Sequence, residues 1–555
     1  MNPAASRESP DAAAWILVGA ALHADGAYPS EVTALGVRGG RIAFVGDDAG
    51  ARAWLGGEGP EVSAAGMHVY PGLVDAHAHL QGLGKSLEEV NLDGARSADE
   101  AAGRVAAAAA RLPEGAWVTG RGWNQNDWPG AAWPTLAALD GVVGERPAYL
   151  TRKDGHAAWV SGAALAMAGI TRDTRDPDGG KILRDGQGRP SGVLVDNAMD
   201  AVAKLRPPDS DETLARRYAK ARDACARAGL TGVHDMGVSA ATLAGLRRMD
   251  AAGELGIRVY ALLDDIPELW TAEFARGPQP AREGGRLTVR AVKLYADGAL
   301  GSRGAALLED YADEPGNRGL LVLSAEALEE RVRRAADAGY QVCVHAIGDR
   351  GNRVVLDAFE KALGARRGGG PLHVLRPRVE HCQVLHPDDI ERFARLGVIA
   401  SMQPIHCTSD MGWAQMRLGR ERCAGAYAWR ALASRGVPLA FGSDFPVESP
   451  DPRLGLYAAV TRQDAAGSPE GGWFPEERLT RAEALRAFTS GAALAAFAES
   501  ELGSLAVGRL ADLTIFDRHL GTGPASNLLA AQVWATVTGG RPVFAADPER
   551  WRGVN

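Results

Sequence analysis

The sequence has 555 residues, of which 46% are hydrophobic and 23% charged, and its formal net charge is −8. This composition is that of an ordinary folded protein, and the length permits roughly two to four domains, or one large barrel with additions. The acidic charge, spread without long single-sign runs, argues against nucleic acid as a partner, because phosphate binding requires a basic face.

The two ends of the chain predict small β-sheet elements. Residues 14–68 contain short apolar runs bounded by Gly and Asp, namely WILVGAAL, EVTALGV, RIAFVGD and HVYPGLVD. The apolar run 12–22 follows Arg7 but also two acidic residues, so we interpret it as the first strand rather than as a signal peptide. GRLADLTIFD and VWATVTGGRPVF near the C-terminus have the same character. We therefore expect the two ends to pair into one flanking sheet domain.

The middle of the chain alternates between short apolar strands and Ala/Arg/Glu-rich helical segments. The strands include GLTGVHDMG, LTVRAVKLYADG, YQVCVHAIGD, RPRVEHCQV, GVIASMQP and VPLAFGSDFP, and AEALEERVRRAADAG is one of the helices. Repeated strand–helix units predict a parallel sheet, either closed or doubly wound. Polar residues follow nearly every strand, which is where barrel enzymes place their chemistry.

Residues 83–225 are too long for one strand–helix loop and predict an inserted subdomain. This segment carries five clustered tryptophans, at positions 117, 123, 128, 133 and 159. They either form a small hydrophobic core of the insertion or line a substrate pocket, and in the second case Trp123 is the candidate pocket residue. The chain contains no stretch that approaches the ~20 apolar residues of a membrane span.

Histidines at strand ends predict a metal site. His77 and His79 end the strand HVYPGLVDAHAH, and alternate residues of a strand point to the same face, so both imidazoles can reach one ion. His345 and His381 each end a later strand-like run. Imidazole is a usual nitrogen ligand of zinc and similar ions.

Asp444 and Lys293 extend this pattern. Asp444 follows the apolar strand of VPLAFGSDFPV, where it either ligates a metal and its bound water or caps the next helix. Lys293 is one of only seven lysines and lies inside the strand TVRAVKLYADG. Burial lowers a lysine pKa, and the neutral amine can react with carbon dioxide to form an anionic, bidentate carbamate. The alternative is a lysine paired with Asp297 or Asp235.

PGLVDAHAHL, AVKLYADGALGSRGAAL, VCVHAIGDRGN, RVEHCQ, SMQPIH, AFGSDFPV and VGRLADLTIFD together resemble the amidohydrolase superfamily, and within it the branch of N-substituted formamide deformylase. The resemblance implies an α/β fold: a (β/α)8 TIM barrel (69–499) with an insertion around 83–225. It also implies a flanking β-sandwich from both chain ends (1–68 and 500–555). The implied metal ligands are His77, His79, Lys293, His345, His381 and Asp444.

The resemblance implies two divalent ions, with zinc expected from the ligand set, and a carbamate on Lys293. Asp444 would act as base beside a metal-bound hydroxide, and the reaction would cleave the C–N bond of a small amide such as an N-substituted formamide. The motifs RKDGH, VHDMG and SMQPIH place His156, His234 and His406 as candidate substrate-binding residues.

Two other functions stay open. A mononuclear deaminase of the same superfamily would use a glutamate of strand five or six as acid, but Glu380 precedes His381 and is expected to point away from the metal face. A non-catalytic relative would have lost ligands. The five cysteines form no CxxC pair, which favours a reducing compartment, and we expect a cytoplasmic enzyme with no membrane partner and a homodimer as a candidate assembly.

Overall fold

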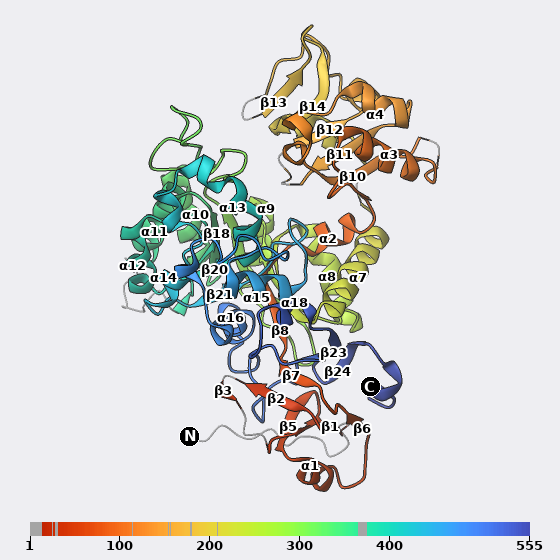
Figure 1. Ribbon diagram of the computed structural model, residues 1–555, viewed down its shortest axis with the longest axis vertical. Coiled ribbons are helices and arrows are strands. Elements are labelled where there is room, and N and C mark those ends of the chain that lie inside the picture. Colours follow the sequence, from red (N-terminus) through yellow and green to blue (C-terminus); the bar gives the residue numbers. More distant parts are fainter. Residues whose placement is uncertain are drawn as a thin grey trace. The chain divides into compact units, whose positions relative to one another are not determined.

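The computed structural model describes residues 14–554 except 25, 28–30, 114, 154, 156, 178–179, 208 and 365–373. The chain divides into two compact units, one formed by Met1–Leu80 with Arg222–Asn555 and the other by Gln81–Ala221. Figure 1 colours the chain by sequence, so that the barrel strands can be followed from β8 to β21.

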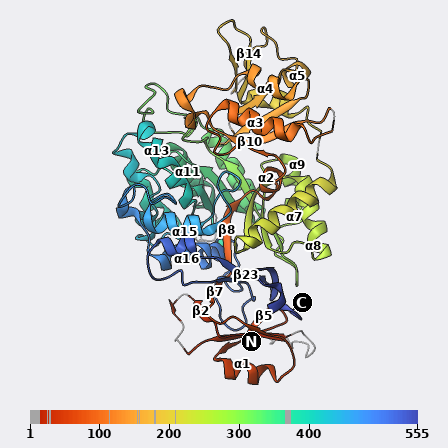
Figure 2. The same cartoon turned by 45° about the vertical axis from the view of Figure 1, so that its right-hand side comes forward.

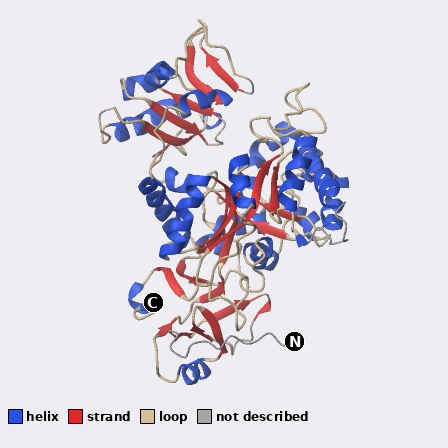
Figure 3. Cartoon of the chain, turned by 180° about the vertical axis from the view of Figure 1, so that it is seen from behind, coloured by secondary structure: helices blue, strands red, loops and turns tan. Residues whose placement is uncertain are grey.

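Eight parallel strands form the centre of the first unit, with helices around them (Figure 3). In sheet order they are β8 (Leu73–Ala78), β15 (Leu230–Val238), β16 (Arg258–Leu263), β17 (Leu287–Tyr295), β18 (Gln341–Ala346), β19 (Arg378–His381), β20 (Ile399–Met402) and β21 (Leu439–Phe441). Beyond β21, Asp444 N donates to His77 O (2.8 Å) and Phe445 O accepts from His79 N (2.9 Å), which joins the last strand to the first. The predicted (β/α)8 barrel is confirmed.

Helices follow the barrel strands along the chain. They are α7 (Asp211–Arg227), α8 (Ala240–Ala252), α9 (Pro267–Phe274), α10 (Ala325–Asp337), α11 (Asp349–Gly364), α12 (Pro387–Leu396), α13 (Pro404–Leu418), α14 (Trp429–Ala433), α15 (Pro452–Thr461), α16 (Arg481–Phe488) and α17 (Ser490–Ala495). The sequence of α10 shows why a helix forms there. The Ser324 side chain caps its N-terminus by accepting from Ala327 N, and Leu328 and Val332 are buried one turn apart on one face.

Both chain ends contribute to two sheets that share one core. One sheet has the order β5-β4-β1-β6, and the other β24-β23-β22-β7-β2-β3. The strands are β1 (Ala14–Val18), β2 (Ala21–Ala24), β3 (Gly26–Ala27), β4 (Ala34–Arg38), β5 (Arg41–Gly46), β6 (Glu61–Ser63), β7 (His68–Pro71), β22 (Leu513–Phe516), β23 (Val533–Thr538) and β24 (Arg541–Ala545). Helices α1 (Asp48–Leu55) and α18 (Ser526–Ala530) accompany them.

The pairing of β7 with β22 brings the two ends together, with Val69 opposite Ile515 in antiparallel register. Leu17 of the first sheet and Val537 of the second belong to the same buried cluster. The apolar run 12–22, expected to be one strand, contributes to two strands in different sheets, because Gly19 (φ 75°) turns the chain between them. Strand β7 continues directly into β8 and so connects the sandwich with the barrel (Figure 2).

The second unit is built on a sheet of its own, with the order β13-β14-β12-β11-β10-β9. Its elements are α2 (Leu80–Ser86), β9 (Val90–Asn91), α3 (Ala98–Ala109), β10 (Val118–Trp123), α4 (Leu136–Val143), β11 (Ala148–Arg152), β12 (Ala157–Val160), α5 (Gly162–Met167), β13 (Gly180–Arg184), β14 (Pro190–Asp196) and α6 (Asp200–Ala203). Trp123, Trp128 and Trp159 belong to one buried cluster of this unit.

Candidate metal centre

Imidazoles and a carboxylate gather where the barrel strands end. Potential ligand atoms of His77, His79 and Asp444 all lie within 4.8 Å of one another, and so do those of His381, His406 and Asp444. The two groups share Asp444, which follows β21, while the other residues come from β8, β19 and α13. The carboxyl ends of the strands therefore bring together five side chains that are far apart in the sequence.

Asp444 is central to this arrangement. Its Oδ1 lies 3.2 Å from His79 Nε2 and 3.5 Å from His77 Nε2, and its Oδ2 lies 3.7 Å from His406 Nε2. The residue adopts φ 60°, a left-handed conformation that costs free energy in a non-glycine residue and is frequent at functional sites. Burial alone would raise the pKa of the Asp444 carboxyl, but the adjacent imidazoles of His79 and His77 lower it well below its usual value.

Three of the histidines present Nε2 to the site because Nδ1 is already used. Nδ1 of His77 lies 2.7 Å from Glu380 Oε2, that of His79 lies 3.1 Å from Met236 O, and that of His381 lies 2.8 Å from Gln403 Oε1. A ring N–H that donates to such an acceptor leaves the lone pair on the other nitrogen. Burial, together with Lys293 at His77 and His345 at His381, lowers the pKa of both rings, which favours the neutral, ligating form.

Lys293 lies at the same site. It is buried in β17, and its Nζ is 3.3 Å from His77 Nε2. Among the described residues, no carboxylate oxygen lies within 4.0 Å of Nζ, and burial lowers the pKa of the amine. Neither alternative partner is paired with it, because Asp297 accepts from the backbone of 306, 347 and 348, and Asp235 accepts from Leu80 N.

His345 lies next to His381. Their ring centroids are 4.5 Å apart, and His345 Nε2 lies 3.6 Å from Asp297 Oδ1. His345 is on β18 and His381 on β19, two neighbouring strands of the barrel. The six predicted ligands all lie on or shortly after barrel strands, but His345 belongs to neither of the two groups of converging ligand atoms.

Glu380 is the main residue whose position differs from the expectation. It was expected to point away from the metal face, yet its carboxylate accepts from His77 and forms a fully buried ion pair with Arg378 (2.8 Å). Strict alternation fails here because His381 adopts φ 75°, which interrupts the extended backbone at the end of β19. The sequence feature that could have identified Glu380 is its position directly before His381 at the end of a strand.

Asp75 is a second residue of the site, and the sequence patterns did not single it out. It is buried on β8 and accepts from Ser443 N, Ser443 Oγ and His77 N. Burial raises its pKa to about 7. Gly442 makes this contact possible, since a Cβ there would lie 2.4 Å from Asp75 Oδ1 and 2.5 Å from His77 N. Asp75 thus links β8 to the segment that carries Asp444.

The expected substrate-binding residues fall in different places. His406 lies at the metal centre, whereas His156 lies outside the described residues. His234 is buried inside the barrel, with Nδ1 2.9 Å from Arg378 Nη1. Trp123 is fully buried in the core of the second unit, and its indole N–H donates to Leu150 O (2.7 Å). This burial supports the first interpretation of the tryptophans, that they form a small hydrophobic core of the insertion.

The side chains present fit a divalent metal. Nitrogen and carboxylate donors are the usual ligands of zinc, and several lone pairs converge on one small volume. Nε2 of His406 is buried and has no hydrogen-bond partner among the described residues, although a buried polar atom normally has one. A bound cation would take up the converging lone pairs, and the unpartnered Nε2 of His406 would stay available to a molecule bound beside it.

The closed barrel and its convergent imidazoles define the class of this protein, the metal-dependent barrel hydrolases. The chain belongs to the amidohydrolase family, whose model matches residues 61–544. It is 34% identical to YtcJ of Bacillus subtilis over 494 residues, which cover 88% of this chain and 91% of that protein. It is 28% identical to N-substituted formamide deformylase of Arthrobacter pascens over 501 residues, covering 87% and 89%.

The crystal structure of an uncharacterized metal-dependent hydrolase from Pyrococcus horikoshii superposes with a TM-score of 0.76 at 29% identity. The match covers 92% of this chain and 99% of that one. All five cysteines of the chain are buried free thiols. Among the described residues, no helix has both the length and the apolar content needed to cross a membrane.

Proposed function

We propose that this chain hydrolyses the C–N bond of a small amide, with an N-substituted formamide as the first candidate substrate. The observation that carries the proposal is the shared position of Asp444 between His77 and His79 on one side and His381 and His406 on the other. A carboxylate in that position can both help to hold a metal and exchange a proton with a reacting molecule.

We assign His77, His79, Lys293, His345, His381 and Asp444 as the residues that hold two divalent ions, with zinc as the first candidate. When bound, such ions lower the pKa of water and polarise a carbonyl. Glu380 and Gln403 hold the rings of His77 and His381 in the orientation that this role needs. Lys293 acts as a carbamate: its neutral amine forms an N–C bond with carbon dioxide and loses one proton.

Asp444 serves as the general base and then as the general acid. Its lowered pKa keeps the carboxylate ionised at neutral pH, so it can accept a proton from the attacking water. The new C–O bond forms first, and the tetrahedral intermediate then breaks its C–N bond as the same proton passes to the leaving amine nitrogen. His406, whose Nε2 faces Asp444, donates to the oxygen of the substrate carbonyl as negative charge develops there.

The alternative of a mononuclear deaminase needs a glutamate of strand five or six as acid. Glu380 accepts a hydrogen bond from His77, forms an ion pair with Arg378 and is fully buried. These contacts count against its acting as the acid of a deaminase. The similarity to N-substituted formamide deformylase supports a formamide rather than an aminoheterocycle as the first substrate to test.

The test measures metal content and hydrolysis on one preparation. The purified chain, loaded with zinc or manganese, is given N-alkyl formamides, the matching acetamides, lactams, esters and an aminopyrimidine. We expect about two ions per chain and release of amine from the formamides. Release of ammonia from the aminopyrimidine alone, with one ion per chain, would support the deaminase instead.

Variants connect the activity to the site. His77→Ala and His345→Ala are expected to lose metal and turnover together while the fold is kept. His386→Ala is the control, because His386 lies at the start of α12 outside the metal centre. Full metal content in either of the first two variants would contradict the ligand assignment.

A further inference from the structure

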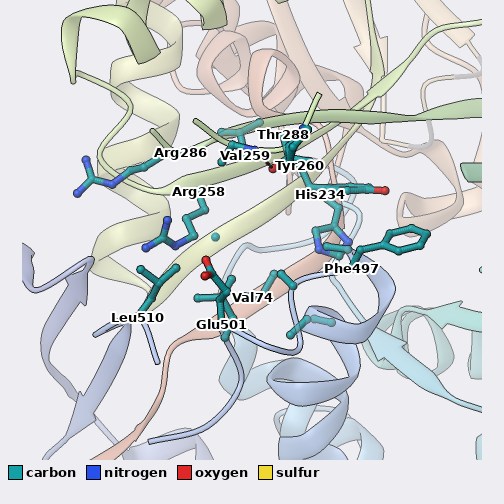
Figure 4. A pocket seen from close by; sticks show the side chains of 18 of the residues that line it. Val74, His234, Arg258, Val259, Tyr260, Arg286, Thr288, Phe497, Glu501 and Leu510 are labelled. Carbon is teal, nitrogen blue, oxygen red and sulfur yellow. Dashed lines mark hydrogen bonds between the residues drawn. The ribbon is translucent and has the colours of Figure 1, made fainter. Parts of the chain in front are cut away.

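A cavity of about 280 Å³ lies at the opposite end of the barrel from the metal centre. Its walls include the first residues of four barrel strands, such as Val74 of β8 and Arg258 of β16, and the segment that follows α17 (Figure 4). His234 and Tyr260 are buried walls of this cavity, whereas Pro280 and Glu501 are exposed at its rim. The cavity is therefore accessible from solvent and independent of the hydrolytic site.

Arginines give the cavity its charge. Arg258 is neutralised by Asp512, with two nitrogen–oxygen distances of 2.6 and 2.8 Å, and Arg286 donates to Thr538 O. Glu501, the carboxylate at the rim, is paired with Arg41 (3.0 Å). Arg290 differs from both arginines, because none of the described residues gives its guanidinium a hydrogen bond or an anionic partner.

Arg290 is held in place but not neutralised. Its guanidinium carbon lies 3.6 Å from the ring centroid of Phe497, a cation–π contact that fixes the plane of the group. Nε is buried without a hydrogen-bond partner, and no carboxylate of the described residues lies within 4.0 Å of the guanidinium. A buried donor of this kind is costly to leave unpaired, and a carboxylate matches the planar guanidinium well.

The rest of the lining is apolar. Val74, Val259, Ala492, Ala493 and Ala496 line the cavity with small aliphatic groups, next to the Phe497 ring. A fully polar anion such as inorganic phosphate would leave these walls unmatched, and a cation would be repelled by the arginines. The volume is close to the lower end of the ~300–1,000 Å³ typical of small-molecule sites.

We propose that this cavity binds a small organic monocarboxylate, with the carboxylate at Arg290 and the apolar body against Val74, Val259 and Ala496. The ligand class follows from one unneutralised guanidinium at the edge of an aliphatic and aromatic pocket. The proposal does not depend on the reaction catalysed at the other end of the barrel.

Calorimetric titration of the metal-loaded full chain with benzoate and butyrate tests this, with benzyl alcohol and butan-1-ol as neutral analogues of similar shape that contain no C–N bond. We expect both carboxylates to bind, and each alcohol to bind at least about tenfold more weakly, because the charged hydrogen bond is lost. Arg290→Gln is expected to weaken benzoate binding by a similar factor, and Ala496→Leu to weaken it by filling the cavity. Arg435→Gln on the surface is the control.

The two variants also separate this cavity from the metal centre, which could itself bind a carboxylate. Benzoate affinity that is unchanged in both Arg290→Gln and Ala496→Leu would overturn the proposal, and so would the absence of benzoate and butyrate binding at millimolar concentration. If Arg290→Gln fails to fold, Ala496→Leu alone decides the result, because this variant keeps the guanidinium of Arg290 and only reduces the volume of the cavity.

Discussion

At the level of single residues, the surroundings of Lys293 distinguish it from an ordinary buried cation. Its Nζ lies 3.3 Å from Nε2 of His77, and no carboxylate oxygen of the described residues lies within 4.0 Å of it. Burial lowers the pKa of the amine, so the neutral form that reacts with carbon dioxide is favoured. An anionic carbamate would offset the positive charge of two divalent ions, whereas an ammonium would add to it.

We therefore predict that Lys293→Ala loses the binuclear centre. Metal analysis should show fewer ions per chain and a large loss of turnover, and short carboxylic acids added in solution should restore part of the activity. Bicarbonate should accelerate reconstitution of the metal-free wild-type protein. Electron density for an unmodified lysine in a metal-loaded crystal would rule out the carbamate.

Asp444 supplies a second prediction. Asp444→Asn keeps the shape of the side chain but removes the base, so turnover should fall by several orders of magnitude while much of the metal is kept. Because the pKa of Asp444 is lowered, the wild-type carboxylate should remain in its active form at mildly acidic pH. Steady-state rates and metal content of the two proteins test this, and near-normal turnover of the variant would assign proton transfer to another residue.

Glu380 supplies a third prediction, as a positioning residue for His77. Glu380→Gln should weaken metal binding by about 10- to 100-fold, because the acceptor that orients the ring becomes neutral. Competition with a chelator measures this affinity, and Glu380→Asp should recover part of it. Glu360→Gln is the control. If Glu380→Gln keeps the metal affinity of the wild type in this competition, Glu380 does not position His77 for metal binding.

At the level of strands and helices, three histidines tie the two chain ends together in the sandwich. His23 of β2 and His68 of β7 are hydrogen-bonded through their rings (2.9 Å), and His519, after β22, lies 4.3 Å from His23 between ring centroids. Burial and the neighbouring imidazoles of His519 and His68 together lower the pKa of His23 to about 3. The pKa values of His68 and His519 are also lowered by burial.

The folded state thus favours the neutral rings, whereas the unfolded chain takes up protons below its ordinary histidine pKa of about 6.5. Stability should therefore decrease as the pH falls from about 6.5 towards 3. Thermal unfolding at pH 7.5 and 5 should show this loss. His23→Gln should reduce the slope of stability against pH, whereas His386→Gln, at the start of α12 and outside the sandwich, should not. Equal slopes for His23→Gln and wild type would contradict the role of the cluster.

At the level of the whole molecule, the second unit has a core of its own, in which Trp123 is completely buried. Trp123→Ala should destabilise that unit by about 3–5 kcal/mol, because a large cavity replaces the ring. The proposed metal ligands all belong to the other unit, so metal content should stay unchanged. Denaturant unfolding followed by tryptophan fluorescence measures the loss, and a change in substrate preference without a loss of stability would favour the pocket interpretation.

Strand periodicity predicted a parallel sheet, closed or doubly wound, and sheet elements at both chain ends. The ordered motifs, through their resemblance to the amidohydrolase superfamily, then predicted the closed barrel, the sandwich formed by both ends and the family. The same patterns identified Lys293 and Asp444 as residues that need a special environment, because a charged group at an apolar strand is costly to bury without a partner.

The orientation and support of these residues, in contrast, depend on the tertiary fold. The positive φ of His381 places Glu380 against His77, against the expected alternation, and the close approach of Gly442 to Asp75 connects the first and last strands. His234 lies in the barrel interior at Arg378, although its motif suggested a pocket residue. Backbone dihedrals and contacts between distant strands set these relations, and no local periodicity encodes them.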